Sequence, residues 1–209
     1  MTLFWDWNGT LLNDVMLCSD LINEMLTSHG YAPVGGLDAY RAVFCFPIET
    51  YYQNAGFDFS RHPFAQLADE YIAQYSARSV CCPLQPHAQK VLRTLQQRGV
   101  QQLILSASPI SLLREQVTKH GITSYFDALL GLDNVYAKSK VAPGKAWLTE
   151  SGLSPADAIM IGDSVHDYEV SLALGTGCVL YSGGHQPRAV LAATGAPVID
   201  DLTELLSLR

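Results

Sequence analysis

Short apolar runs alternate with segments of helical periodicity along most of the chain. Leu3, Phe4 and Trp5 form the first apolar run, which ends in the polar turn Asp6-Trp7-Asn8-Gly9-Thr10. Because strands that are buried on both faces appear as short continuous apolar runs, we expect parallel strands that alternate with helices. The predicted strands cover residues 3–5, 102–106, 125–130, 158–161, 178–181 and 197–199, and the predicted helices cover residues 87–98, 109–120, 143–151, 165–174 and 187–194. This alternation predicts an α/β fold with a Rossmann-like parallel sheet and helices on both faces.

The segment between the first strand and residue 81 has a different pattern. Apolar residues recur at helical spacing over 14–29, Gly30 ends that helix, and the following helical pieces break at Pro47, Gly56 and Pro63. None of this segment shows the alternating pattern of a half-buried strand. We therefore expect two parts, a core domain of residues 1–13 and 81–209 and a small inserted α-helical cap of residues 14–80.

Composition and charge limit the classes of partner. Thirteen Lys and Arg residues against twenty Asp and Glu residues give a net charge of −7, which disfavours a nucleic-acid partner. No apolar run approaches the length of about 18 residues that a membrane span needs, so no membrane partner is expected. The five cysteines form no CxxC pair, which favours a reducing compartment and predicts a cytoplasmic protein.

Most of the residues that follow three of the predicted strands carry carboxylate, amide or hydroxyl side chains. Loops at the carboxyl ends of parallel strands build the binding crevice of such sheets. The residues concerned are Asp6, Asn8 and Thr10 after the first strand, Ser106, Ala107 and Ser108 after the second, and Asp163, Ser164 and Asp167 after the fourth, with Lys138 and Lys140 between the last two groups. Carboxylates of this kind suit Mg²⁺ together with a substrate phosphate, and hydroxyl groups and a lysine can bind phosphoryl oxygens.

These residues also match a known set of motifs. Asp6-Trp7-Asn8-Gly9-Thr10, Ser106, Lys140-Val141-Ala142-Pro143 and Gly162-Asp163-Ser164-Val165-His166-Asp167 occur in the order and spacing of the haloacid dehalogenase-like hydrolases. With its inserted helical segment, the chain resembles the branch that includes phosphoglycolate phosphatase-like enzymes. The resemblance extends over nearly the whole chain, and it favours Lys140 over Lys138 as the motif lysine.

The resemblance implies a Mg²⁺-dependent phosphomonoester hydrolase that acts on a small phosphorylated metabolite. Asp6 would be the nucleophile that forms an aspartyl-phosphate, and Lys140 would balance charge beside it. Thr10, Ser106, Ala107 and Lys140 would bind the phosphoryl group, and the metal would be held by Asp6, the backbone carbonyl of Asn8, Asp163 and Asp167, the last either as a ligand or as the carboxylate that orients Lys140. The family pattern leaves both a monomer and a homodimer open.

Asn8 departs from the family pattern. The usual hydrolases carry at this position a second aspartate, which protonates the leaving oxygen and later deprotonates the attacking water. An amide can do neither at neutral pH, and such acid–base help is worth about 10² to 10⁴ in rate. Three explanations stay open: a slow phosphatase, or one suited to good leaving groups, with another proton donor from the cap or the substrate; a protein that binds phosphorylated ligands without turnover; and a substitution introduced to trap a complex. A phosphotransferase of the same fold is a further alternative.

Two related chemistries are disfavoured, and one cap residue is a candidate for specificity. Phosphonate-cleaving relatives need a cap lysine, but the first lysine of this chain is Lys90, and dehalogenating relatives lack the pair Gly162-Asp163. Arg41 is the candidate that would pair with a second anionic group of the substrate. Tyr40, Phe44 and Phe46 are expected to pack in the cap or its hinge, and His166 is expected to be solvated or packed.

Overall fold

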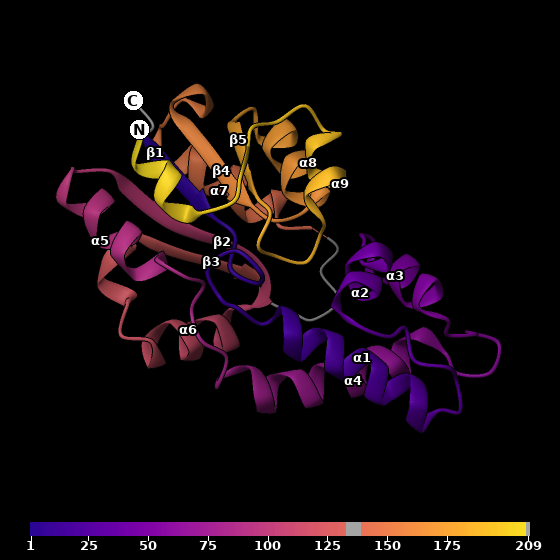
Figure 1. Ribbon diagram of the computed structural model, residues 1–209. Helices are drawn as coiled ribbons and strands as arrows, with labels where there is room; N and C mark the ends of the chain where they lie inside the picture. The colour runs from indigo at the N-terminus through magenta and orange to yellow at the C-terminus, as the bar shows by residue number, and fades with distance from the viewer. Residues whose placement is uncertain (133–138, 208–209) are drawn as a thin grey trace.

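The sheet of the core domain is parallel throughout. The structure, a computed structural model, describes residues 1–132 and 139–207. Within them, six strands pair in the order β3-β2-β1-β4-β5-β6 (Figure 1). The strands are β1 (Thr2–Trp5), β2 (Gln101–Pro109), β3 (Ala128–Leu132), β4 (Ala158–Gly162), β5 (Gly177–Tyr181) and β6 (Val198–Ile199). The chain order reverses between β1 and β4, so the carboxyl ends of β2, β1 and β4 lie side by side at the switch point, where such sheets bind ligands.

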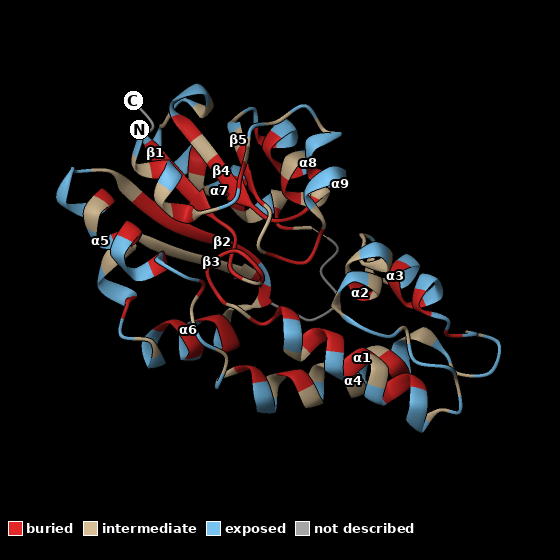
Figure 2. Ribbon diagram, viewed as in Figure 1, coloured by how far each residue is buried: buried red, intermediate tan, exposed pale blue. Residues whose placement is uncertain are grey.

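Helices cover both faces of the sheet. Along β1, Leu3 and Trp5 pack into one hydrophobic cluster and Phe4 into another, because successive side chains of a strand point to opposite faces. The first cluster includes residues of α5 (Ala88–Gln97), α6 (Ile110–Lys119) and the 3₁₀ turn η3 (Leu202–Ser207). The second includes residues of α7 (Val141–Ser151) and α8 (Val165–Leu174). The central strands are buried from both sides (Figure 2), so the predicted fold class is confirmed.

The inserted segment forms a helical body beside the sheet (Figure 1). It contains α1 (Val15–Ser28), α2 (Leu37–Val43), α3 (Ile48–Ala55) and α4 (Phe64–Ser79). Its own hydrophobic cluster is built around Leu21, Ile22 and Tyr52, and Leu112 of α6 joins this cluster from the core. The separate cluster supports the predicted division at about residues 14 and 80, which we keep as a proposal.

Two strands differ from the predicted ranges by three residues at one end, and the other four differ by one residue. The third strand begins at Ala128 instead of residue 125, because Thr123–Tyr125 forms the 3₁₀ turn η1 and Asp127 accepts a hydrogen bond from the Gln102 amide at 3.0 Å. The second strand continues to Pro109, with an irregular register between Leu105 and Pro109. Ala107 and Ser108, which lie beyond the predicted strand, are therefore at its irregular end.

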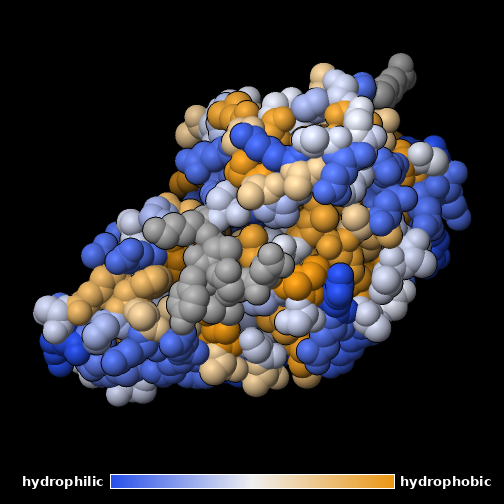
Figure 3. Space-filling model, turned by 180° about the vertical axis from the view of Figure 1, so that it is seen from behind, coloured by the Kyte–Doolittle hydropathy of each residue, from blue (hydrophilic) through white to orange (hydrophobic). Residues whose placement is uncertain are grey.

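The remaining elements are short, and the surface is mixed. They are the 3₁₀ turn η2 (Pro155–Asp157) and the helix α9 (Arg188–Ala192). Seen from behind, hydrophobic side chains reach the surface between hydrophilic areas (Figure 3). Among the helices of the described residues, none combines the length and the hydropathy that crossing a membrane requires.

Candidate active site

The first and fourth strands bring two of the predicted carboxylates to one edge of the sheet. Asp6 follows β1, and its backbone amide donates to the carbonyl of Ile161 on β4 at 2.8 Å. Asp163 follows β4 directly. The Thr10 hydroxyl lies between the two, 3.1 Å from Asp163 Oδ1 and 3.5 Å from Asp6 Oδ2. Adjacent parallel strands thus place residues from opposite ends of the sequence in one site.

Lys140 is buried between two carboxylates. Its Nζ donates to Asp6 Oδ1 and lies 2.6 Å from Asp167 Oδ1, and only 2% of the residue is exposed. Burial alone would lower the pKa of this lysine, but the two carboxylates raise it above its ordinary value, so Lys140 stays charged. Lys140 therefore bridges the two carboxylates, through a hydrogen bond to Asp6 and an ion pair with Asp167.

The first turn of α8 fixes Asp167. Ser164 caps this helix, since its side chain accepts from the Asp167 amide while Asp167 Oδ2 accepts from the amides of Asp163 and Ser164 and from the Ser164 hydroxyl. Asp167 Oδ1 is left to face Lys140. The cap of the helix therefore orients the lysine, which is one of the two roles predicted for Asp167.

Two glycines leave the space that Asp163 occupies. A Cβ atom at Gly9 would lie 2.3 Å from Asp163 Oδ2, and one at Gly184 would lie 2.1 Å from the same atom. Gly9 also has a φ of +74°, a conformation that residues with a side chain rarely adopt. The Asp163 carboxylate is held in this space by the His185 amide, which donates to Oδ2 at 2.6 Å.

The charges of the cluster fit a divalent cation. Oxygens of Asp6, Asp163 and Asp167 lie within 4.8 Å of one another, and Lys140 is the single lysine or arginine against them among the described residues that line the cavity. Burial raises the pKa of Asp6 well above its ordinary value, in spite of Lys140, and the neighbouring Asp167 and Asp163 raise it further. Burial, with Asp167, also raises the pKa of Asp163 to about 6. A hard cation with oxygen ligands, such as Mg²⁺, would compensate this excess of negative charge.

Asn8 is fixed by three side chains. Its Nδ2 donates to Asp14 Oδ2 at 2.9 Å and to the Tyr75 hydroxyl at 2.5 Å, and its Oδ1 accepts from the Ser108 hydroxyl at 2.7 Å. Asp14 also accepts from the Gly9 amide and from Tyr75. Because an ionised carboxylate only accepts hydrogen bonds, the amide at position 8 matches Asp14 where a second carboxylate would oppose it.

His185 completes the network around Asp14. Its Nε2 lies 3.3 Å from Asp14 Oδ1, and its Nδ1 lies 2.8 Å from the Tyr40 hydroxyl. Burial would lower the pKa of His185, but the contacts with Asp14 raise it. Burial would raise the pKa of Asp14, but His185, Tyr75 and Asn8 lower it. The two residues therefore form a buried ion pair beside Asn8.

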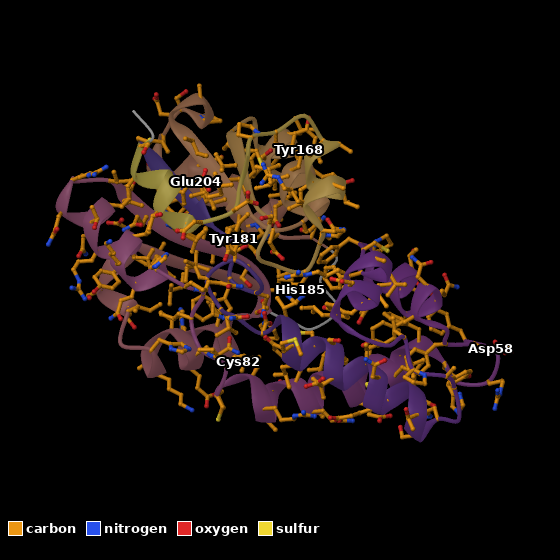
Figure 4. All side chains as sticks on the ribbon, in the orientation of Figure 1. Asp58, Cys82, Tyr168, Tyr181, His185 and Glu204 are labelled. Atoms are coloured by element: carbon orange, nitrogen blue, oxygen red, sulfur yellow. The ribbon has the colours of Figure 1, made fainter. Side chains whose placement is uncertain are left out.

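A cavity of about 220 Å³ lies between the sheet edge and the helical body. Figure 4 shows His185 at this boundary and Asp58 at the far end of the helical body. One end of the cavity is polar and holds the side chains of Asp6, Asn8, Lys140, Asp163 and Asp167. The other is largely apolar and is lined by Phe44, Phe46, Ile48, Tyr71, Ile72 and Leu112. A ligand with a phosphoryl group and an organic part would fit these two ends.

The predicted phosphate ligands differ in their access to this cavity. Ala107, which is exposed, lines the cavity, and the buried Ser108 lines it as well. Thr10 and Ser106 are fully buried and do not line it, and the Ser106 hydroxyl accepts from the Ser108 amide at 3.0 Å. Phosphate binding by Thr10 and Ser106 stays a prediction that this geometry does not support.

Arg41 binds the backbone of the loop after β5. Its guanidinium donates to the carbonyls of Gly184 at 2.9 Å and Gly183 at 3.1 Å, and the residue does not line the cavity. Its predicted role in specificity gains no support from this geometry. The choice between the two motif lysines is likewise limited, since Lys140 has the expected contacts and Lys138 lies outside the described residues.

Sequence reasoning missed several residues of the site. Asp14 and His185 were not identified, and Phe44, Phe46 and His166 line the cavity although they were assigned to packing or to solvent. One signal was available for His185, because the loop after β5 is also a strand end at the carboxyl edge of the sheet. For Phe44 and Phe46 the sequence offered no such signal, because apolar cap residues can face either the cap core or a cavity.

Two curated proteins similar to this chain are named phosphoglycolate phosphatase. A phosphoglycolate phosphatase of Pseudomonas savastanoi pv. phaseolicola is 24% identical over 219 residues, with 98% of this chain and 78% of that protein covered. A phosphoglycolate phosphatase of Rhodobacter capsulatus is also 24% identical, with 97% of this chain and 94% of that protein covered.

Solved structures share the fold over nearly the whole chain. A haloacid dehalogenase-like hydrolase from Streptococcus pneumoniae superposes with a TM-score of 0.85 at 19% identity, covering 99% of this chain and 96% of its own. A protein from Clostridium acetobutylicum described as a predicted phosphatase gives a TM-score of 0.83 at 19% identity, covering 98% of this chain and 95% of its own. The family model of the haloacid dehalogenase-like hydrolases matches residues 3–181, which include Asp6, Lys140 and Asp163. As its motifs predict, the chain therefore belongs to the haloacid dehalogenase-like hydrolase family.

Proposed function

We propose that the protein is a Mg²⁺-dependent phosphomonoester hydrolase that works through an aspartyl-phosphate on Asp6. The observation that carries this proposal is the buried cluster of Asp6, Asp163, Asp167 and Lys140 at the carboxyl ends of the central strands. The phosphatase names of the relatives support the same reaction class. A small phosphorylated metabolite is the proposed substrate, and the free cysteines support the cytoplasm as the proposed location.

The first chemical step is assigned to Asp6. A carboxylate oxygen of Asp6 attacks phosphorus, the bond from phosphorus to the ester oxygen breaks, and the leaving group departs as an oxyanion that takes its proton from water. Lys140 orients the Asp6 carboxylate, because its ammonium group donates to Asp6 Oδ1 and is itself paired with Asp167. Water then cleaves the aspartyl-phosphate, which releases phosphate and restores the Asp6 carboxylate.

Magnesium would be held by Asp6, Asp163 and the backbone carbonyl of Asn8, with Asp167 beside them. When bound, it would neutralise charge on the phosphoryl oxygens, as metal ions do in phosphoryl transfer. Lys140 and the Ala107 amide would contact the remaining phosphoryl oxygens. The buried carboxylates supply no positive charge themselves, so the cation and Lys140 together have to offset the phosphate.

Asn8 restricts the leaving groups that this site can use. The amide cannot protonate a departing alkoxide, and its hydrogen bonds with Asp14 and Ser108 hold it in place. Esters whose leaving oxygen is stable without a proton, such as aryl and acyl phosphates, are therefore expected to react faster than alkyl phosphates. Slow cleavage of the aspartyl-phosphate should also let the phosphorylated protein accumulate.

The same amide favours a second candidate function. If Asn8 abolishes turnover, the cluster remains a site that binds a phosphorylated ligand. This candidate predicts that phosphate compounds and Mg²⁺ together stabilise the fold against heat without any release of phosphate.

Phosphate release from a series of aryl, acyl and alkyl phosphates, with and without Mg²⁺, separates these functions. We expect release that requires Mg²⁺, is lost in Asp6→Asn, and persists in Asp157→Asn, which removes an exposed carboxylate outside the cavity. Release that is independent of Asp6 would refute the proposed mechanism. Stabilisation by ligand without release from any ester would favour the binding protein.

A further inference from the structure

The cap side of the cavity is lined by apolar and aromatic groups. Phe44, Phe46 and Ile48 come from the segment around the start of α3, Tyr71 and Ile72 from α4, and Leu112 from α6. Two of the rings are fixed by stacking: Phe46 lies on His166 with ring centroids 4.4 Å apart, and Phe44 lies on His185 at 4.7 Å. This wall faces the organic part of any ester whose phosphoryl group contacts Asp6.

The described cavity lining offers no free cation to that organic part. Lys140 is its single lysine or arginine, and it already pairs with Asp6 and Asp167. Arg41, the cation that the sequence pointed to, donates to the backbone carbonyls of Gly183 and Gly184. Among the described residues, a substrate carboxylate would therefore meet apolar side chains, the hydroxyl groups of Tyr71, Ser76 and Ser108, and the carboxylates of the site, but no unpaired lysine or arginine.

The two histidines of the described cavity lining do not add an unpaired cation. Both ring nitrogens of His185 are engaged, one by Asp14 and one by the Tyr40 hydroxyl. The His166 ring is covered by Phe46, and its Nδ1 lies 3.6 Å from Glu169 Oε2. A buried anion without a partner is strongly disfavoured, since it loses its hydration and gains no hydrogen-bonded counterion.

The wall also agrees with the chemistry at Asn8. An aryl group fits the flat rings of Phe44 and Phe46, where aromatic pairs pack in offset or edge-to-face arrangements. A phenolate is also a leaving group that needs little protonation, which suits a site with an amide at position 8. Cavity lining and leaving-group chemistry are independent observations, and both point to the same kind of ester.

We propose that the substrate of this site is a small aryl phosphate whose organic part carries no charge, and that phosphoglycolate, with its carboxylate, is a poor substrate. This inference rests on the proposed phosphatase function and adds the class of the organic group. It also separates this chain from the activity for which its curated relatives are named.

The test compares two esters of nearly equal size, 4-carbamoylphenyl phosphate and 4-carboxyphenyl phosphate, together with phosphoglycolate. We expect kcat/KM to be on the order of tenfold to a hundredfold higher for the carbamoyl ester, because its amide needs no counterion. Acetyl phosphate, which is small and has a good leaving group, reports the phosphatase reaction without using the aromatic wall.

A matched pair of variants removes the effect of leaving-group acidity from this comparison. Ile72→Arg adds a cation to the wall, while Ala73→Arg adds the same charge to α4 at an exposed position outside the cavity lining. Ile72→Arg should raise kcat/KM for the carboxyl ester about tenfold relative to the carbamoyl ester. Ala73→Arg should leave that ratio unchanged.

The outcomes are distinguishable. Mg²⁺-dependent release from acetyl phosphate with equal or better turnover of the carboxyl ester or phosphoglycolate would overturn the inference and leave the proposed function intact. An unchanged substrate ratio in Ile72→Arg would also overturn it. No release from any ester, acetyl phosphate included, would overturn the proposed function and this inference with it.

Discussion

Replacing Asn8 by aspartate should weaken the fold and at the same time strengthen catalysis. The amide nitrogen of Asn8 lies 2.9 Å from Asp14 Oδ2, so Asn8→Asp places two carboxylate oxygens in contact. Asp14 is buried in a network with Tyr75 and His185, and position 8 is half-buried beside it.

The size of the effect follows from two competing terms. Two charges at 2.9 Å repel by about 6 kcal/mol at an effective dielectric constant of about 20. Protonating one carboxyl at pH 7 costs about 4 kcal/mol, since its ordinary pKa is about 3.9. Protonation is the smaller cost, so the pair should share one proton at pH 7, and the variant should lose roughly 2 to 4 kcal/mol of unfolding free energy.

The sign of the pH dependence is fixed by the raised pKa of the new carboxyl. Its folded-state pKa lies above the unfolded value, so its penalty is small near pH 4 and grows as the pH rises towards the folded-state pKa. Urea unfolding should therefore show a smaller difference from the wild type at pH 5 than at pH 7. The double variant Asn8→Asp/Asp14→Asn restores a contact between an amide and a carboxylate and should recover most of the loss.

The same proton should help catalysis. A carboxyl that stays protonated at pH 7 can protonate a leaving alkoxide, so Asn8→Asp should raise the turnover of alkyl phosphates by about 10² or more. Asn54→Asp, which makes the same change at an exposed position of α3, is the control for both assays. Equal unfolding free energies for wild type and Asn8→Asp at both pH values would refute the electrostatic reasoning. Unchanged alkyl turnover would mean that another group already donates the proton.

Three further predictions concern the carboxylates around the cavity. Asp163→Asn should weaken Mg²⁺ binding, measured by titration calorimetry, and phosphate release together; Mg²⁺ affinity equal to that of the wild type would exclude Asp163 as a ligand. Gly184→Ala should impair Mg²⁺ binding in the same assay, because the added methyl group would lie 2.1 Å from Asp163 Oδ2, and a wild-type affinity would show that the loop adjusts without cost. The pair of Asp14 and His185 should stabilise the fold most between about pH 4 and pH 6.5. At lower pH its contribution falls, because Asp14 takes up a proton below its ordinary pKa. At higher pH its contribution falls as well, because His185 loses a proton above its ordinary pKa. Urea unfolding of wild type and Asp14→Asn across pH 4 to 9 measures that contribution, and a constant difference would contradict the ion pair.

The sequence by itself determined the fold class and the place of the main cluster. Alternating strands and helices imply a parallel sheet, and the carboxyl ends of its central strands must lie together whatever the details of packing. Asp6 and Asp163 could therefore be assigned to one site although 157 positions separate them in the sequence. The order of the motifs also singled out Lys140, whose contacts with Asp6 and Asp167 agree with that choice.

Only the tertiary structure decided which side chains face the cavity. The contacts of Asn8 with Tyr75 and of Tyr40 with His185 join residues of the helical body to the sheet edge, and the contact of Asn8 with Ser108 joins the ends of two strands. Such contacts depend on how the inserted helices lie against the core and on individual rotamers, and no periodicity in the sequence encodes either. For the same physical reason, Arg41 could be recognised as a cap cation from the sequence, while its hydrogen bonds to the backbone of the loop after β5 could not.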